Sequence, residues 1–147
     1  MKEARVERSV GYLVKRAQQG LRRQCDAALR PVGLTMAQYA VLRALHDHPE
    51  ASASDLARLC FVTRQSLRDV LVGLRSAGLA DDADSVPQGR RRALHLTARG
   101  AKTLQAGHAA VLGVESAMLK GIPAKAHSEL AAMLTRCAEN LDSPPEV

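Results

Sequence analysis

The side chains best suited to binding chemistry lie in one polar stretch near the middle of the chain. They interleave with an apolar stripe at helical spacing, formed by Leu67, Val70, Leu71 and Leu74. A helical wheel turns the stripe inward and the polar groups outward. In the major groove of DNA, arginine can pair with guanine and glutamine with adenine, while amides at a helix start can bind phosphate. Base or phosphate contacts are therefore predicted for Thr63, Arg64, Gln65, Ser66 and Arg68.

A second group of cations stands next to a glycine turn, at Arg90, Arg91 and Arg92. Adjacent positive charges repel one another unless an anion is close, and the minor groove of DNA would supply one. An ordinary charged loop stays open as the alternative, because nearby carboxylates could neutralise the cluster. These carboxylates belong to Asp81, Asp82 and Asp84.

Other kinds of chemistry have little support in the sequence. The five histidines and three cysteines show no HExxH or CxxC spacing, so we expect no metal site and no cofactor. No nucleophile can be paired with a base, which predicts that the chain is not an enzyme. Cys25 lies near Arg22 and Arg23 and is a hypothetical redox sensor, whereas Cys60 and Cys137 are expected to be buried.

Charge and composition agree with an anionic partner and a reducing compartment. The chain has 147 residues, a net charge of +6 and a pI near 9.7, and aromatic residues make up only 2%. Widely separated cysteines in odd number argue against a disulfide framework. No apolar run approaches the roughly 18 residues that a membrane span needs, so a cytoplasmic protein is expected.

Helix signals and turn signals alternate along most of the chain. A long amphipathic helix is predicted from Val6 to Leu29, ended by Pro31 and Gly33. A capping box at Thr35 and Gln38 begins a second helix that extends to about His46, with His46 and His48 at its end.

A short third helix is expected after the cap at Ser52, and Phe61 and Val62 form a tight apolar turn before the fourth. Gly78 ends the fourth helix. The period then changes, which predicts a hairpin. A fifth helix opens at Thr97, and a sixth follows the break at residues 121–123.

These elements predict a mainly α fold with a small β-hairpin wing, a six-helix winged helix-turn-helix. We expect one domain over residues 1–147, with a winged helix-turn-helix at 34–97, its recognition helix at 63–77 and its wing at 79–97. The terminal segments, 6–30 and 98–142, carry apolar stripes that the central unit is too small to cover. They are therefore predicted to form a homodimer interface.

The span from Gly33 to Gly100 resembles the MarR family of bacterial transcription regulators. The matching motifs are Leu34-Thr35, Asp55-Leu56-Ala57, Val62-Thr63-Arg64-Gln65-Ser66, Ala77-Gly78-Leu79 and Leu96-Thr97-Ala98-Arg99-Gly100. The resemblance implies that residues 63–77 enter the major groove and that Arg90 is the wing-tip arginine. It also implies a small aromatic or phenolic ligand near Met36, Tyr39 and the basic residues of the first helix.

The chain departs from the family pattern at several positions. Gln88 replaces the aspartate that usually orients the wing arginine, and Asp69 replaces a common arginine. Asp82 or Asp84 could hold Arg90 instead. The leading hypothesis is a ligand-responsive repressor that binds a palindromic operator in double-stranded DNA as a homodimer. The alternative, motivated by Asp69 and the acidic first wing strand, is a dimeric interaction module with weak or lost DNA binding.

Overall fold

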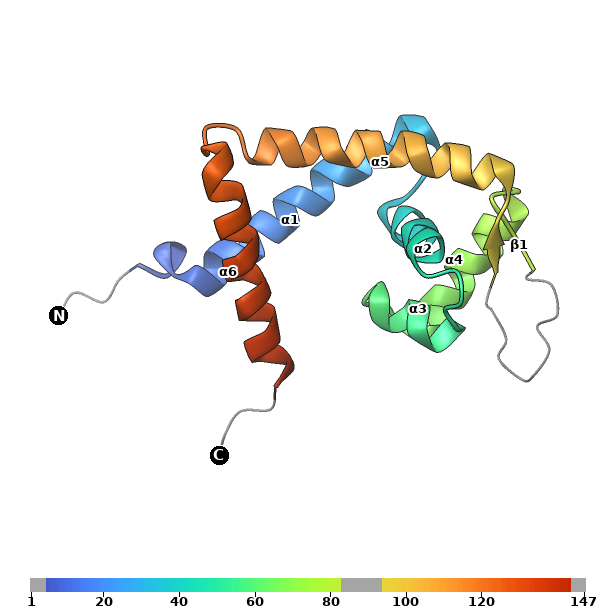
Figure 1. The fold of residues 1–147 in the computed structure, drawn as a ribbon, viewed down its shortest axis with the longest axis horizontal. Helices are drawn as coiled ribbons and strands as arrows, with labels where there is room; N and C mark the ends of the chain where they lie inside the picture. Colours follow the sequence, from blue (N-terminus) through green and yellow to red (C-terminus); the bar gives the residue numbers. More distant parts are fainter. Residues whose placement is uncertain (1–4, 83–93, 144–147) are drawn as a thin grey trace. The chain divides into compact units, whose positions relative to one another are not determined.

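The computed structural model describes residues 5–82 and 94–143 and has the predicted mainly helical architecture with one hairpin (Figure 1). Short 3-10 turns at Val6–Arg8 and Arg30–Val32 flank the first helix. A two-stranded antiparallel hairpin lies between the fourth and fifth helices. The elements are α1 Val10–Leu29, α2 Met36–Asp47, α3 Ala53–Leu59, α4 Arg64–Ser76, β1 Ala80–Asp81, β2 His95–Leu96, α5 Ala98–Met118 and α6 Ala124–Asp142.

Side-chain caps fix where the first four helices begin. Thr35 and Gln38 form the predicted capping box of α2, and Ser52 and Asp55 form a second one on α3. The prediction for the first helix was wrong at its start. The Ser9 hydroxyl accepts a hydrogen bond from the Tyr12 amide, so α1 begins at Val10 and the preceding residues form a separate turn.

Three helical segments end in the same left-handed turn. In each, two amides bond back across the turn, as in the Schellman motif. The left-handed residue is Gly33 at φ 83° after α1, Phe61 at φ 54° after α3 and Gly78 at φ 71° after α4. Two of the three positions thus have the residue that a positive φ favours.

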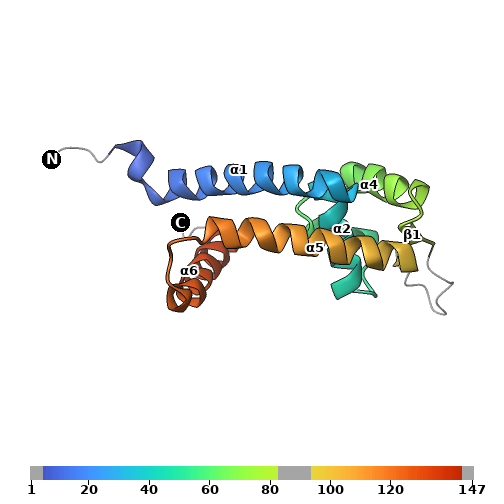
Figure 2. The same cartoon turned by 90° about the horizontal axis from the view of Figure 1, so that it is seen from above.

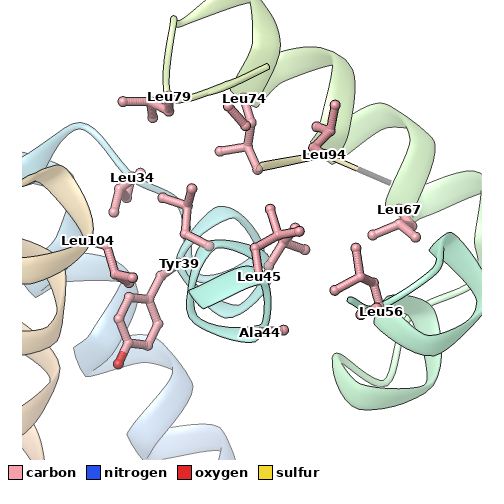
Figure 3. Packing of buried hydrophobic residues seen from close by; sticks show 14 of the residues in the cluster. Leu34, Tyr39, Ala44, Leu45, Leu56, Leu67, Leu74, Leu79, Leu94 and Leu104 are labelled. Carbon is pink, nitrogen blue, oxygen red and sulfur yellow. The ribbon is translucent and has the colours of Figure 1, made fainter. Parts of the chain in front are cut away.

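The chain divides into two compact units, Met1–Val114 and Glu115–Val147. The first contains the apolar core, in which leucines from α1, α2, α3, α4 and the hairpin meet (Figure 3). Six of them are at most 1% exposed: Leu29, Leu42, Leu56, Leu67, Leu74 and Leu94. Each such side chain contributes about 2 kcal/mol through burial, so this core holds the helix pair α3 and α4 in place.

A polar clip joins the end of α4 to the start of α5. The Thr97 hydroxyl donates to the Gly78 carbonyl over 2.7 Å and accepts from the Gly100 amide over 3.0 Å. A Cβ on Gly100 would lie 1.9 Å from the Leu79 carbonyl oxygen, so only glycine permits this approach. The hairpin pairs Ala80 with Leu96 and is anchored at its base by this clip.

The second unit consists of the end of α5, a turn and α6. Gly121 supplies the turn with φ 83°. No residue of α6, which is described along its whole length, is buried. Met133, Leu134 and Leu141 are exposed by 60%, 47% and 84%, and Cys137 is exposed rather than buried as expected. Within the second unit, α6 thus lacks the apolar cover that a helix of this kind needs.

Candidate nucleic-acid interface

Helix α4 presents a polar face beside the short helix α3. Leu67 and Leu74 anchor it in the core, and Val70 and Leu71 are half-buried against the same cluster. The helix therefore turns its remaining side chains to solvent, as the predicted wheel requires. All five predicted contact residues of this segment are exposed: Thr63, Arg64, Gln65, Ser66 and Arg68.

Two of these residues organise the start of the helix. The Thr63 side chain accepts from the Ser66 amide over 3.1 Å, and its hydroxyl donates to the Ser66 hydroxyl over 3.0 Å. Capping by a threonine satisfies one of the amides that a helix start leaves open. Thr63 and Ser66 thus define the first turn on which Arg64 and Gln65 are carried.

The two arginines of this face are available to an anion. Among residues 5–82 and 94–143, neither Arg64 nor Arg68 forms an ion pair, whereas Arg58 pairs with Asp55 at 3.1 Å. A guanidinium that is charged, exposed and without an internal carboxylate suits a phosphate or a guanine edge. The charge on this face is therefore offered outward.

Asp69 lies on the same face and contacts Gln65. Its carboxylate accepts from the Gln65 Nε2 over 3.3 Å, one helical turn away. Asp69, which replaces the arginine of the family pattern, thus has a hydrogen-bond partner on the same helix. The contact orients the amide of Gln65, which would need both its donor and its acceptor to recognise adenine.

The predicted wing can be followed only at its base. Arg90, Arg91 and Arg92, together with Gln88 and Asp84, lie outside the described residues. Asp82 is described, and its carboxylate pairs with Arg75 of α4. This pair ties the base of the hairpin to α4. The expectation that Asp82 or Asp84 holds Arg90 stays a prediction, because Arg90 lies outside the described residues.

The predicted ligand residues lie on α2. Met36 is half-buried at the start of the helix, where its amide donates to Asp26 Oδ1 of α1 over 3.2 Å. Tyr39 is 7% exposed and belongs to the core. Its hydroxyl contacts His108 Nδ1 of α5 over 3.0 Å, and Arg43 Nη1 contacts the same nitrogen over 3.1 Å.

This junction between α2 and α5 was missed by the sequence reasoning. A guanidinium can only donate, so the contact from Arg43 uses His108 Nδ1 as an acceptor. Arg43 also binds Asp47 over 2.8 Å, and that hydrogen bond raises the pKa of the Arg43 guanidinium. Residues 39 and 108 are 69 positions apart, and no periodicity relates them; only the fold brings them together.

A groove of about 500 Å³ lies along the C-terminal half of α1. All its lining side chains are polar, and three arginines face one carboxylate among them, which would suit an acidic ligand better than a neutral one. It contains basic residues of the first helix, as the family resemblance implied, but neither Met36 nor Tyr39. The lining residues are Gln18, Gln19, Arg22, Arg23, Asp26 and Arg30.

The cysteines lie in three different environments. Cys25 is 1% exposed within the core side of α1, and such burial limits the access of an oxidant. Burial raises the pKa of the Cys60 thiol, which reduces its thiolate fraction. Cys137 is exposed on α6. The hypothesis of a Cys25 redox sensor therefore gains no support from its surroundings.

The described residues contain neither a metal-binding cluster nor a membrane-spanning helix. Within residues 5–82 and 94–143, no cluster of three histidine, cysteine or acidic side chains is arranged to bind a metal ion. In the same part of the chain, no helix combines the length and the apolar composition required to span a bilayer.

A short capped helix, a tight turn, a second helix with an exposed basic face and a following hairpin define a winged helix-turn-helix protein. A family model described as MarR family matches residues 32–91. The HTH-type transcriptional repressor Rv2887 of Mycobacterium tuberculosis is 35% identical over 127 residues, which cover 86% of this chain and 91% of the repressor. The chain belongs to the MarR family.

Solved structures of the same repressor superpose on this chain. The crystal structure of M. tuberculosis Rv2887 in complex with salicylic acid has a TM-score of 0.75 at 33% identity, covering 93% of this chain and 99% of that one. The complex of Rv2887 with DNA has a TM-score of 0.73 at 32% identity, covering 88% and 97%. The predicted family and fold are thus confirmed.

Proposed function

We propose that this protein is a sequence-specific transcriptional regulator, a repressor that binds double-stranded DNA through α4 and acts by binding rather than by catalysis. The observation that carries the proposal is the outer face of α4, where Arg64 and Arg68 are exposed and pair with no carboxylate of the described residues. Support comes from the relative Rv2887, a repressor whose structure with DNA has the same fold.

Each residue of the face has a proposed part in this recognition. Arg64 and Arg68 contact phosphates or guanine edges, and Gln65 reads an adenine with its amide oriented by Asp69. Thr63 and Ser66 fix the first turn and direct its amides toward a phosphate. Arg90, Arg91 and Arg92 are proposed to add minor-groove contacts from the wing at 79–97.

The proposed binding form is a homodimer. The N-terminal half of α1 exposes Val10 by 71% and Val14 by 47%, and α6 buries nothing of its own. A second copy would cover these stripes, which lie in the proposed dimerisation segments 6–30 and 98–142. The pair of winged units at 34–97 would then read an inverted repeat with half-sites about one helical turn apart.

A small aromatic acid is the proposed effector. The relative Rv2887 has been crystallised with salicylic acid, and the groove on α1 presents Arg22, Arg23 and Arg30 to a carboxylate. Met36 borders the same region through its hydrogen bond to Asp26. Tyr39, with its hydroxyl on His108, would link ligand binding to α5.

The test is a fluorescence anisotropy titration against duplexes selected from a random library, at two salt concentrations. We expect tight binding to an inverted repeat that weakens steeply with salt, because each neutralised phosphate releases counterions. Arg68→Ala should reduce affinity by about tenfold or more, as the loss of one good base contact does. Arg90→Ala should weaken binding to all sequences.

The competing function is a dimeric interaction module that has lost DNA binding, which the carboxylate of Asp69 on the reading face would favour. It predicts a dimer that binds no duplex at moderate salt.

Salicylate added to the DNA complex tests the proposed effector class. If salicylate leaves the affinity unchanged up to millimolar concentration, the proposed effector class is wrong while the DNA-binding function stands.

A further inference from the structure

The turn between α3 and α4 has an unusual residue at its left-handed position. After Arg30 and after Arg75, the chain reverses through Gly33 and Gly78 with paired amide bonds, Leu34 N to Leu29 O at 3.2 Å and Leu79 N to Leu74 O at 2.9 Å. After Arg58 the same motif recurs, with Val62 N to Ala57 O at 3.0 Å and Phe61 N to Arg58 O at 3.3 Å. Here the left-handed residue is a phenylalanine.

Phenylalanine is a poor choice for this backbone. A positive φ brings Cβ close to the backbone oxygen, and glycine or asparagine normally takes the position. A bulky residue at φ 54° is therefore retained against a conformational cost, and such residues gather at functional sites. The two sister turns show that this chain uses glycine where the motif alone decides.

Packing of the Phe61 ring within the chain does not offset this conformational free energy. Its side chain is 95% exposed, the highest value among the large apolar residues that are described. The following residue, Val62, makes the apolar contact of the motif and packs against the core, as Leu34 and Leu79 do in the sister turns. The aromatic ring is thus free to meet another molecule.

The surroundings of the ring indicate a polyanion. Phe61 stands two residues before Thr63, the cap of α4, and lies between Arg58, which pairs with Asp55, and Arg64, which pairs with no carboxylate of the described residues. Along the chain, Leu59 is an apolar neighbour of the ring and is 40% exposed. The exposed face that begins two residues after the ring is polar and carries Arg64, so we take the partner of the ring to be DNA rather than a protein. The start of α4 is also where the proposed base contacts begin.

We propose that Phe61 binds DNA directly, placing its ring against an apolar part of the duplex beside the first turn of α4. The inference rests on the proposed DNA-binding function and adds a recognition residue to it. The apolar surfaces that a DNA duplex offers to such a ring are the C5-methyl group of thymine and the C–H edge of deoxyribose. Contact with the methyl would add sequence preference, and contact with the sugar would add affinity alone.

The first experiment compares Phe61→Gly, Phe61→Asn and Phe61→Leu on the duplex selected by the wild-type protein. Glycine and asparagine suit the left-handed backbone, so both variants should keep or raise the thermal midpoint while losing about fivefold to thirtyfold in affinity. Leucine should lose less. The matched control is Gly33→Asn, which puts asparagine at the left-handed position of a sister turn outside the winged unit and should leave affinity unchanged.

The second experiment replaces each thymine of that duplex by deoxyuracil, one position at a time. If uracil at one position weakens binding by the wild-type protein but not by Phe61→Gly, the thymine methyl at that position is the contact. If Phe61→Gly is weaker than wild type and no uracil position distinguishes them, the ring lies on deoxyribose. Both results support the proposal.

Three outcomes overturn it, and they differ in what else they affect. If wild type binds the selected duplex and Phe61→Gly binds equally well, Phe61 is no DNA contact and the proposed function stands. If wild type selects no duplex from the library, the DNA-binding function fails and the Phe61 contact fails with it. A lower thermal midpoint for both Phe61→Gly and Phe61→Asn would show that the ring serves the fold instead.

Discussion

At the scale of single residues, the left-handed turns provide an internal measurement of backbone strain. Gly33, Phe61 and Gly78 occupy equivalent positions in the same hydrogen-bonded motif, and neither glycine has an atom within 4 Å of where a Cβ would stand. Side-chain contacts therefore contribute little to the comparison. What differs between the three positions is the preference of the residue for positive φ.

This equivalence predicts stability changes of opposite sign. Gly33→Ala and Gly78→Ala should each lower the free energy of unfolding by about 1 kcal/mol, whereas Phe61→Gly should leave it unchanged or raise it by up to about 1 kcal/mol. Urea denaturation followed by circular dichroism measures all three. A loss of more than about 1 kcal/mol in Phe61→Gly would contradict the assignment of strain to this residue.

A second residue-level prediction concerns acid pH. Hydrogen bonds from the Ser52 amide and hydroxyl, followed by the charge of Arg58, lower the pKa of Asp55 below its ordinary value of 3.8. A lowered carboxyl pKa contributes stability that is complete above the unfolded-state value and is lost as pH falls through the folded-state value.

The capping box of α3 should therefore weaken below about pH 4. Asp55→Asn should flatten the acid side of the stability profile. The profile is the thermal midpoint measured from about pH 2.5 to about pH 6, in steps of about half a pH unit. Ser52→Ala should flatten it too, because it removes one of the hydrogen bonds. An acid slope that persists in both variants would assign it to other carboxyls.

At the scale of elements, the starts of α2, α3 and α4 and the ends at Gly33 and Gly78 were predictable because their signals are local. A cap and its amide lie within three residues, so Thr35, Ser52 and Thr63 could be identified from sequence. The start of α1 was misplaced because apolar spacing continues through residues 6–8, and Ser9 was not recognised as the cap.

The contacts that join elements could not be predicted in the same way. Asp26 accepts a hydrogen bond from the Met36 amide, and Tyr39 and Arg43 both contact His108. Each of these contacts joins residues far apart in sequence, so it depends on the path of the chain between them. The candidate site was predictable where one helix carries it, at Arg64, Gln65 and Arg68. The groove on α1 was not, because its existence depends on side-chain conformations rather than on spacing.

The junction of the hairpin with α5 yields an element-level prediction. Gly100→Ala would place a methyl against the Leu79 carbonyl, and backbone cannot move aside cheaply, so we expect a loss of about 3 kcal/mol. Gly113→Ala, on the same helix and with nothing within 4 Å, is the control and should be neutral or stabilising. Figure 2 shows α5, which carries both positions. Equal effects of the two changes would refute the close approach.

At the scale of the whole molecule, apolar side chains are exposed on α1 and on α6. Leu13 is 43% exposed on α1, and Leu134 is 47% exposed on α6, which buries no residue. Exposed apolar surface of this extent is typical of an interface. The proposed homodimer would bury it and bring two copies of α4 to one duplex.

The corresponding prediction is that charge on these stripes separates the copies. Leu134→Glu should shift sedimentation equilibrium toward monomer and reduce operator affinity by more than about tenfold, since one half-site alone is left. Thr135→Glu adds the same charge to the neighbouring exposed position and is the control. A Leu134→Glu protein that stays dimeric and binds DNA normally would place the interface elsewhere.

The distribution of charge has one more consequence for this molecule. The ion pairs of the described residues lie at the surface, and the described core contains no charged side chain, so salt acts only weakly on folding. Its proposed hold on DNA, by contrast, depends on displaced counterions. A cell that loses water and concentrates its ions would release the protein from its operators while leaving it folded, so the same pool could return to those operators once water is restored.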